Sequence, residues 1–530
     1  MVWLWRMRCF LYLSDNMENI MMRLIPLVLV CHLSTAPAVL YGQELKIGQT
    51  VAGNIFYESE PRAFIINTDG DSIEWVCYDY WDHEIVSGRS AVAANAVALT
   101  VNPGRSGWFR LIINARKNGR RIASKETSFA IVSDFDLATV KESPFIGQTH
   151  AWQSIDTLIP IAKRMGVKYI RDVIRWEAVE NVKQVYAFKA KQDRFISLLA
   201  QNNLRPYLVL ALYNPLYDKG EAPVSNEAAL AFANYGRQVL SRYPSIDQVE
   251  IWNEPDIGTF SKGLATDEEK AGFYFNLLRT SYELIHPLFP KVKITGFVVS
   301  DRAPDPFLNA IYKKGALKYM DEYAFHSYTP VPEDIVKDIA RHKAIMRSWN
   351  DNSTIPLNLS ETGFTTFRFT ETEQANYLPR RIVNALAGGV SKIGIYNLQN
   401  KSVKHESEGS FGLVRHPDDT LGAYVPKPAF VSYAVLTRQL TGAKFEREEQ
   451  ISPGRIYSFK FKNGDQEIRC MYSPAGAKIR LHASAAIAVT DLMGNKKTYM
   501  PANGIVSLNL DMDLVYVKGI LDAPYWEPCP

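Results

Sequence analysis

The strongest constraint on the fold is a regular alternation of apolar, strand-like runs with helical stretches after about residue 141. Eight such runs begin near Phe145, Tyr169, Tyr207, Val249, Ile294, Tyr323, Leu357 and Ile393. Their spacing averages about 35 residues, enough for one strand, one helix and two loops. The run PYLVLALY (206–213) is continuously apolar, as in a parallel strand covered on both faces. We therefore predict an α/β fold with a (β/α)8 TIM barrel over residues 141–440.

Two of the intervening stretches carry clear helix signals. The stretch DTLIPIAKRMG (156–166) ends on a glycine, and EAALAFANYGRQVLSRY (227–243) repeats its apolar residues with a period near 3.6. No glycine-rich phosphate loop follows the first strand, which disfavours a dinucleotide-binding fold.

Both segments that flank the barrel have the pattern of small β domains. Residues 43–140 contain short β-branched and aromatic runs such as SIEWVCYD and GWFRLIIN, separated by turn signals such as TDGD and NPGRSG. Residues 441–530 repeat this pattern in RIYSFKFKNG and IVSLNL. We predict one β-sandwich domain on each side of the barrel, at residues 43–140 and 441–530.

The first 42 residues have the pattern of an export signal. Arg23 precedes an apolar run at 24–30, and the small residues of STAPA (34–38) suit cleavage after Ala38 or after Gly42. Acidic residues are unusual ahead of such a core, so the acidic Asp15 and Glu18 place the true start at Met21 or Met22. A lipoprotein site at Cys31 is disfavoured by the bulky Val30 before it. We predict that residues 1–42 are a signal peptide and that the protein is secreted or periplasmic.

Composition excludes several kinds of partner. The chain has 60 Lys and Arg against 56 Asp and Glu, a net charge of +4, which is not the strongly basic balance of a nucleic-acid-binding protein. Only three cysteines lie beyond the leader, so the chain is no disulfide scaffold. The leader's apolar run is too short to span a bilayer, and no longer apolar stretch follows. We expect no nucleic-acid partner and no membrane span, and the sequence indicates no oligomeric state.

Two carboxylates stand where predicted strands end. Glu254 closes the fourth strand in EIWNEPD (250–256), and Glu361 closes the seventh in LNLSETGF (357–364). Side chains at the C-terminal ends of barrel strands meet in one mouth. Two carboxyl groups about 5 to 5.5 Å apart can cleave a glycosidic bond with retention, because one attacks the anomeric carbon while the other protonates the leaving oxygen. A surface turn is the alternative reading of each motif taken alone.

The motifs WNEPD (252–256) and SETGF (360–364) resemble those of the clan A glycoside hydrolases, nearest to families 39 and 5. These enzymes retain the anomeric configuration. The resemblance covers about residues 141–440. It implies that Glu254 is the acid/base, that Glu361 is the nucleophile and that Asn253 binds the sugar 2-hydroxyl.

The resemblance extends to other strand ends. It implies that Arg171 in YIRDVIRW hydrogen-bonds the nucleophile and that Tyr328 in AFHSY donates to Glu361. It also implies that His326 in AFHSY and His150 in GQTHAW lie at the sugar. The eighth strand departs from the pattern, because IYNLQN has no tryptophan; Tyr396 or Gln399 takes that place.

The roles of several neighbouring side chains are open from sequence. Trp176 and Tyr213 are candidate substrate-binding platforms, and Trp152 and Trp252 are equally open between sugar stacking and barrel packing. Glu250 shares a strand face with Glu254 but lies deeper, and we interpret it as structural, with a cationic or hydrogen-bonding partner. No HExxH-like spacing joins the histidines and glutamates, so we predict no metal and no cofactor.

These observations predict a retaining β-glycosidase that cleaves an oligo- or polysaccharide by double displacement. Two alternatives remain. A transglycosylase would use the same pair and pass the sugar to another hydroxyl. A carbohydrate-binding protein would keep the barrel without the activity.

Overall fold

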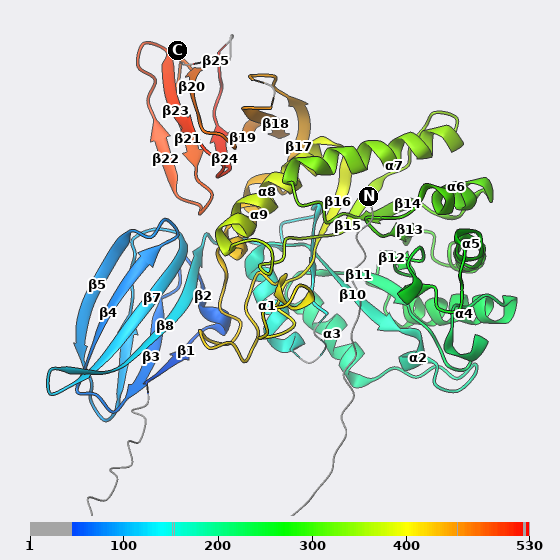
Figure 1. Ribbon diagram of the computed structural model, residues 1–530, viewed down its shortest axis with the longest axis horizontal. Helices are drawn as coiled ribbons and strands as arrows, with labels where there is room; N and C mark the ends of the chain where they lie inside the picture. The colour runs from blue at the N-terminus through cyan, green and yellow to red at the C-terminus, as the bar shows by residue number, and fades with distance from the viewer. Residues whose placement is uncertain (1–44, 151, 153, 453, 523–525, 529–530) are drawn as a thin grey trace, which may run out of the picture. The chain divides into compact units, whose positions relative to one another are not determined.

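The computed structural model describes residues 45–522, apart from 151, 153 and 453, and the backbone of 526–528. A closed barrel of eight parallel strands lies between two β-rich regions of the sequence (Figure 1). The predicted fold class is confirmed. The predicted leader lies outside the described residues, and none of the helices in the described part is long and apolar enough to cross a bilayer.

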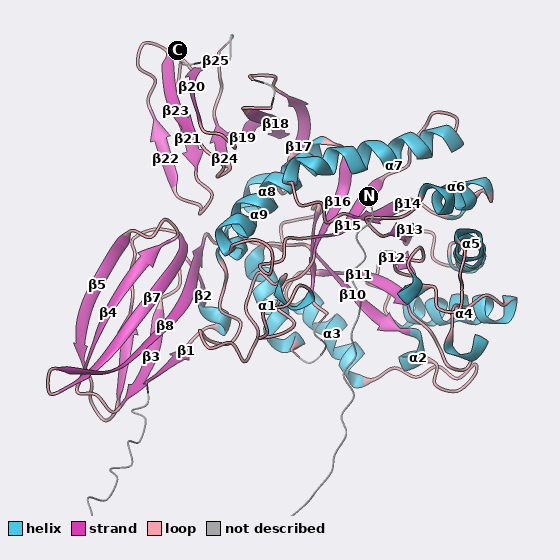
Figure 2. Cartoon of the chain, in the orientation of Figure 1, coloured by secondary structure: helices cyan, strands magenta, loops and turns pink. Residues whose placement is uncertain are grey.

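The barrel strands pair in sequence order, and the last strand closes on the first. Every predicted strand position falls inside one of them. Most of their residues are buried, since helices cover the outside (Figure 2). The strands are β9 (Phe145–Gln148), β10 (Tyr169–Arg175), β11 (Arg205–Ala211), β12 (Gln248–Ile251), β13 (Lys293–Val299), β14 (Glu322–His326), β15 (Leu357–Thr362) and β16 (Val390–Ile395).

The helices between these strands begin and end where their sequences indicate. α1 ends at Gly166, which adopts φ 84°, a left-handed conformation that glycine tolerates best. α4 begins after Ser225, whose side chain accepts a hydrogen bond from the Ala228 amide. The helices are α1 (Ile155–Met165), α2 (Trp176–Val179), α3 (Ala190–Gln201), α4 (Asn226–Arg242), α5 (Asp267–Ile285), α6 (Asp305–Lys313), α7 (Ile335–Trp349), α8 (Glu371–Ala387) and α9 (Pro428–Leu440).

The N-terminal β region forms two sheets around one apolar core. Phe64 of one sheet packs on Phe129 of the other, and Phe129 stacks on Phe109 with ring centroids 5.0 Å apart. Pairing is antiparallel except between β2 and β8. One sheet has β1 (Leu45–Gln49), β3 (Ala63–Thr68) and β6 (Ala96–Thr100); the other has β2 (Ile55–Tyr57), β8 (Arg120–Val132), β7 (Gly107–Lys117), β4 (Ser72–Asp79) and β5 (Glu84–Ala91).

The C-terminal β region also has two sheets, with a core that includes Met471, Ile479, Leu481 and Val517. The described residues from 45 onward belong to one compact unit, so the domain boundaries placed at 140 and 440 stay predictions. The larger sheet has β17 (Lys444–Glu448), β18 (Tyr457–Asn463), β19 (Gln466–Tyr472), β24 (Val515–Lys518), β21 (Ile487–Thr490) and β22 (Lys496–Tyr499); the smaller has β23 (Ile505–Leu510), β20 (Ala477–His482) and β25 (Trp526–Pro528).

Candidate active site

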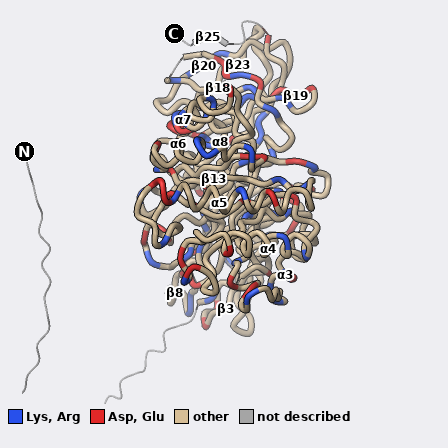
Figure 3. The backbone as a smooth tube through the Cα atoms, turned by 90° about the vertical axis from the view of Figure 1, so that its right-hand side faces the viewer, with Lys and Arg blue, Asp and Glu red and all other residues tan. Residues whose placement is uncertain are grey.

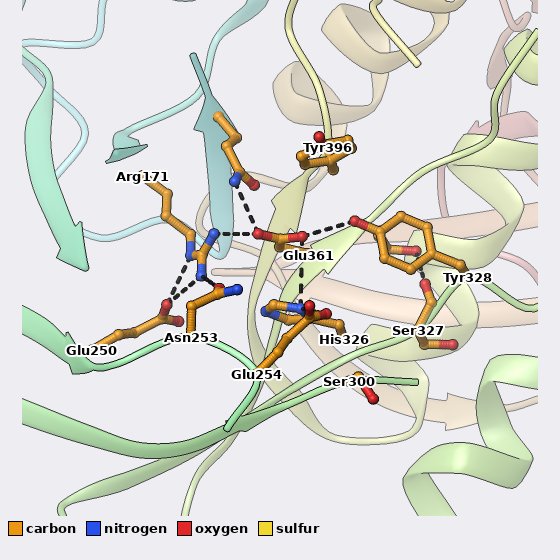
Figure 4. A network of polar contacts seen from close by, with 12 residues as sticks. Arg171, Glu250, Asn253, Glu254, Ser300, His326, Ser327, Tyr328, Glu361 and Tyr396 are labelled. Atoms are coloured by element: carbon orange, nitrogen blue, oxygen red, sulfur yellow. Dashed lines mark hydrogen bonds and ion pairs between the residues drawn. The ribbon is translucent and has the colours of Figure 1, made fainter. Parts of the chain in front are cut away.

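Glu254 and Glu361 converge at the C-terminal end of the barrel. Glu254 follows β12, and Glu361 is the last residue but one of β15. One carboxylate oxygen of each, and a ring nitrogen of His326, all lie within 4.8 Å of one another. His326 Nδ1 is 2.8 Å from Glu254 Oε1 and 3.6 Å from Glu361 Oε2, so the imidazole bridges the pair (Figure 4).

An unusual backbone turn carries Glu254 to this position. Trp252 has φ 71° and Glu254 has φ 42°, values that residues other than glycine rarely adopt. The Glu254 amide donates to the Val298 carbonyl at 2.8 Å, which ties the turn to the end of β13. The turn breaks the strand alternation after Ile251, so Glu250 points into the barrel while Glu254 reaches its mouth. Strained conformations of this kind cluster at functional sites.

Three donors surround the Glu361 carboxylate. Arg171 Nη1 and Gln148 Nε2 donate to Oε1, the latter at 3.0 Å, and Tyr328 OH donates to Oε2 at 2.9 Å. Burial alone would raise the pKa of Glu361, but the nearby His326 and Arg171 outweigh it and hold the pKa well below its usual range. Glu361 is therefore ionised.

Arg171 of β10 joins the site to the barrel interior. Its Nε donates to Glu250 Oε2 at 2.8 Å, and its Nη2 donates to Asn253 Oδ1 at 3.0 Å (Figure 4). Burial alone would lower the pKa of Arg171, but Glu250 and Glu361 raise it above its usual value. Glu250 is fully buried and pairs with this cation. This agrees with the interpretation of Glu250 as a structural residue, since a buried carboxylate needs a cationic or hydrogen-bonding partner.

His326 and Tyr328 come from the end of β14. Burial alone would lower the pKa of His326, but the Glu361 and Glu254 carboxylates raise it above its ordinary value. Burial and the Glu361 charge raise the pKa of Tyr328 well above its usual range. Tyr328 therefore stays protonated and can donate to Glu361.

His150 and Tyr396 complete one wall of the site. The His150 and Tyr396 rings have centroids 5.5 Å apart, and Tyr396 lies edge-on to Tyr328 at 6.1 Å. The Tyr396 hydroxyl contacts both Glu408 and Lys401, which form an ion pair at 2.9 Å. Tyr396 directly follows β16 and lines the pocket. Of the two residues that the sequence offered in place of the strand 8 tryptophan, Tyr396 rather than Gln399 therefore faces the pocket.

A cavity of about 1000 Å³ opens above the paired glutamates. This volume is at the upper end of the range for small-molecule sites, so the cavity has room for more than one sugar ring. Its lining includes His150, Arg171, Asn253, Glu254, Tyr328, Glu361 and Tyr396 among the predicted site residues, and His326 lies beneath them.

Two predicted platforms are corrected by the structure. Trp176 is 1% exposed, stacks on Tyr217 with ring centroids 5.0 Å apart and donates to Glu180 at 2.6 Å. It opens α2 directly after β10, so the helical turn directs it into the core rather than toward the cavity. Tyr213 does not line the cavity either.

Tyr213 holds a loop that lines the cavity. Its hydroxyl donates to the Thr259 carbonyl at 2.8 Å and accepts from the Lys262 amide at 3.0 Å. Thr259 and Phe260 of this loop line the cavity, and the fully buried Trp252 donates to the Phe260 carbonyl at 2.8 Å. Of the open aromatic residues, Trp152 is the one that lines the cavity.

Sequence reasoning missed several residues of the site. Gln148 contacts His150 as well as Glu361, and strand alternation from His150 would have found it. Glu408, Lys401 and Phe411 come from the long loop between β16 and α9 and also line the cavity. No periodic pattern in the sequence marks them.

A buried arginine outside the cavity anchors the segment that carries Tyr328. Arg381 of α8 is fully buried and donates to Thr362 Oγ1 at 3.0 Å, to Thr329 Oγ1 at 2.9 Å and to the Ser327 carbonyl at 3.3 Å. It therefore fastens the ends of β14 and β15 to each other, next to Tyr328 and Glu361.

Glu254, His326 and Glu361 are, within the described residues, the group whose geometry would suit a metal ion. The surroundings disfavour one. Arg171 donates to Glu361 Oε1, and Tyr328 donates to Oε2. Both carboxylate oxygens therefore already accept hydrogen bonds from the protein, and the arginine charge already balances the carboxylate. The absence of a metal stays a prediction.

A barrel with one glutamate after its fourth strand and another at the end of its seventh is the arrangement of the clan A glycoside hydrolases, which the motifs resemble. The chain is similar in structure to a family 39 glycoside hydrolase from the gut symbiont Bacteroides cellulosilyticus WH2. That match has 18% identity, a TM-score of 0.74, and covers 90% of this chain and 100% of the other.

Two further family 39 structures are similar over about three quarters of this chain. A GH39 enzyme from Xanthomonas axonopodis pv. citri and a GH39 β-xylosidase from Caulobacter crescentus each have 16% identity and a TM-score of 0.52. The matches cover 74% and 72% of this chain and 96% of each of the others. No family model and no curated protein matches the sequence. At these identities the likeness establishes a shared fold.

Proposed function

We propose that the protein is a retaining β-glycosidase that hydrolyses an oligo- or polysaccharide by double displacement. The main support is that Glu254 and Glu361 each place a carboxylate oxygen in one cavity, with the two oxygens within 4.8 Å of each other. Retaining enzymes hold their carboxyl groups about 5 to 5.5 Å apart, whereas inverting enzymes leave about 6.5 to 9.5 Å for a water molecule. The separation therefore favours direct attack by one carboxylate.

In the first step the ionised Glu361 attacks the anomeric carbon and Glu254 gives its proton to the leaving oxygen. The C–O bond to the leaving group breaks with both electrons, which the proton captures, and a glycosyl ester forms on Glu361. The environments support this division of roles. Arg171 and Tyr328 donate to Glu361, while among the described side chains only His326 makes a hydrogen bond or ion pair with the Glu254 carboxylate.

In the second step Glu254 takes a proton from water, and the oxygen of that water attacks the anomeric carbon. The ester bond breaks and Glu361 leaves as a carboxylate, which Arg171 and Tyr328 again stabilise. Two inversions at one carbon give net retention.

Asn253 is placed to bind the sugar. Its Oδ1 accepts from Arg171 Nη2 at 3.0 Å, which leaves its Nδ2 to donate to a substrate hydroxyl. The resemblance assigns this contact to the 2-hydroxyl next to the reacting carbon. A bond there strengthens as positive charge develops on the ring.

The stereochemistry of the first product tests the proposal. Hydrolysis of an aryl β-glycoside followed by proton NMR should show the β-anomer first, with the α-anomer growing in later by mutarotation. An α-anomer as first product would overturn the retaining mechanism. Product analysis with added acceptor sugars separates hydrolysis from transglycosylation, and binding without any cleavage would favour the carbohydrate-binding alternative. No observation on the described residues favours either alternative.

We further propose that the protein is exported and acts in polysaccharide degradation. Support comes from Arg23, the apolar run at 24–30 and the small residues at 34–38. Expression in a Gram-negative host, fractionation and N-terminal sequencing of the recovered chain test this. Cleavage after Ala38 or Gly42 and recovery outside the cytoplasm are expected; an uncleaved cytoplasmic chain would contradict export.

A further inference from the structure

The wall of the cavity formed by β10, α3 and the segment between them carries an unusual set of cations. Five Lys or Arg occur between residues 175 and 194. Two of them, Lys183 and Arg194, do not line the cavity, and both have a carboxylate partner. Lys183 pairs with Glu227 at 2.7 Å, and Arg194 pairs with Asp156 at 2.6 Å.

The cations that face the cavity differ. Lys189 and Lys191 line it, and neither has a carboxylate partner in the described part of the chain. Arg175 also lines it, and its contact with Glu177 is long, at 3.5 Å, with both side chains about half exposed. Exposed pairs of this kind contribute little. The cavity wall therefore presents positive charge that the protein itself does not neutralise.

An aromatic ring lies on the same wall. Trp152 lines the cavity and packs against Phe195 of α3, with ring centroids 4.9 Å apart. Lys191 precedes Phe195 by four residues, so the two side chains share one helix face. An indole face suits the apolar face of a sugar ring, and the ammonium groups beside it suit an anionic substituent on that ring.

The acidic residues of the cavity are already engaged. Asp172 accepts from Thr149 Oγ1 at 2.5 Å and from the Val173 amide at 2.7 Å. Glu361 is held by Arg171, Glu254 contacts His326, and Glu408 pairs with Lys401. These four acids face six Lys or Arg in the lining. Along the backbone drawn in Figure 3, basic and acidic residues are interspersed.

We propose that Lys189, Lys191 and Arg175, with Trp152, form a subsite for a sugar that carries a carboxylate or a sulfate group. The substrate of the enzyme is then an anionic glycan. This inference rests on the proposed glycosidase function for its catalytic meaning. Binding of the anion, however, depends on the cations alone and can be measured without catalysis.

Calorimetry on the full chain tests the subsite. The Glu361→Gln variant serves as the background, so that oligosaccharides are not consumed. Three probes of equal length are compared: β-linked mannuronate oligosaccharides (carboxylate), carrageenan oligosaccharides (sulfate) and β-linked xylo-oligosaccharides (neutral). At low ionic strength one anionic series should bind at least about tenfold more tightly than the neutral series. In about 0.5 M NaCl this advantage should largely disappear.

A matched pair of double variants locates the effect. Lys189→Gln/Lys191→Gln should lower affinity for the preferred anionic series by about tenfold. The control is Lys291→Gln/Lys293→Gln, which has the same spacing and charge change but lies at the start of β13, at the opposite end of the barrel. It should bind as the parent does. Far-ultraviolet circular dichroism checks that both variants fold.

The outcomes are distinct. A carboxylate preference identifies a uronic-acid substrate, and a sulfate preference a sulfated one. If no anionic series binds more tightly than the neutral one, or if the preference survives in Lys189→Gln/Lys191→Gln, the subsite proposal is wrong. Hydrolysis of aryl β-glycosides by the wild-type chain is scored separately. An anion preference without hydrolysis would keep the subsite and remove the glycosidase, whereas hydrolysis without preference would do the reverse.

Discussion

Arg171 donates to Glu361 through Nη1 and to the fully buried Glu250 through Nε, and its Nη2 lies 2.6 Å from the same Glu250 oxygen. One cation thus holds the proposed nucleophile and also neutralises a carboxylate in the barrel interior. The proposed nucleophile is thereby fastened to the barrel strands rather than supported by loops alone.

Arg171→Met should therefore damage stability as well as activity. Removing the cation leaves the buried Glu250 without its charge partner and takes one of three donors from Glu361, which costs about 3 to 5 kcal/mol. Chemical denaturation followed by tryptophan fluorescence measures the loss. Arg347→Met removes an exposed arginine of α7 and should change stability by less than about 0.5 kcal/mol. Equal effects of the two substitutions would show that the buried pairs contribute nothing.

The two glutamates should respond differently to substitution. Glu361→Gln removes the nucleophile and should abolish turnover on every leaving group. Glu254→Gln should slow substrates with poor leaving groups by about 10²- to 10⁴-fold, because they need the acid, and should affect activated aryl glycosides less. Azide should rescue Glu254→Gln and yield the β-glycosyl azide.

The exposed Glu283 of α5 supplies the control for this pair. Glu283→Gln should keep the wild-type rate in the same assays. Near-normal rates for both site variants on a natural glycan would mean that the assignment is wrong.

His326 should make stability depend on pH. Its pKa is raised above its ordinary value of 6.5, so the folded state holds the proton more tightly than the unfolded state. This contribution is fully present below pH 6.5 and is lost as pH rises through the folded pKa. The free energy of unfolding of wild type minus that of His326→Gln should therefore fall between about pH 6 and 9.

Glu254→Gln offers the internal check on this effect. Glu254 is one of the two carboxylates that raise the pKa of His326, so the pH dependence should shrink in that background. A difference that is constant with pH, or that grows as pH rises, would contradict the bridge between the carboxylates.

Trp152 and Trp176 should separate binding from packing. Trp176→Ala empties a core site and should cost about 3 to 5 kcal/mol of stability. Trp152→Ala removes a ring that lines the cavity and should raise KM for oligosaccharides, with a smaller loss of stability. Thermal unfolding and steady-state kinetics on the two variants measure both effects. A large loss of stability for Trp152→Ala together with a raised KM for Trp176→Ala would contradict the placement of Trp176 in the core and Trp152 at the cavity.

The barrel was predictable because its strands are apolar on both faces and recur at regular intervals. Glu254 and Glu361 were predictable as a pair because the strand ends of a barrel share a mouth. Arg171 and Tyr328 were predicted only through the resemblance to the clan A motifs, and Arg171 lies inside β10 rather than at its end. The direction in which a side chain points just beyond the end of a strand was not predictable from the sequence. Trp176 follows β10 at once and turns with α2 into the core, and nothing local in the sequence distinguishes that turn from an outward one.

The backbone conformation at Glu254 is a second feature that the sequence could not predict. Its positive φ, and that of Trp252, depend on contacts with β13 and β11 that are distant in sequence, such as the bonds from the two amides to Val298 and Leu210. The pairing of Tyr396 with Glu408 and Lys401 likewise depends on how a long loop folds back. Strand periodicity carries no information on either.

The most direct measurement is to trap and locate the covalent intermediate. A 2-deoxy-2-fluoro β-glycoside with a good leaving group should inactivate the enzyme, because the fluorine slows breakdown of the ester more than it prevents its formation. Mass spectrometry of the digested protein should then find the sugar on the peptide that contains Glu361, bound to that residue. A label on Glu254 or another residue, or steady hydrolysis of a cleavable glycoside with no adduct at all, would contradict double displacement through Glu361.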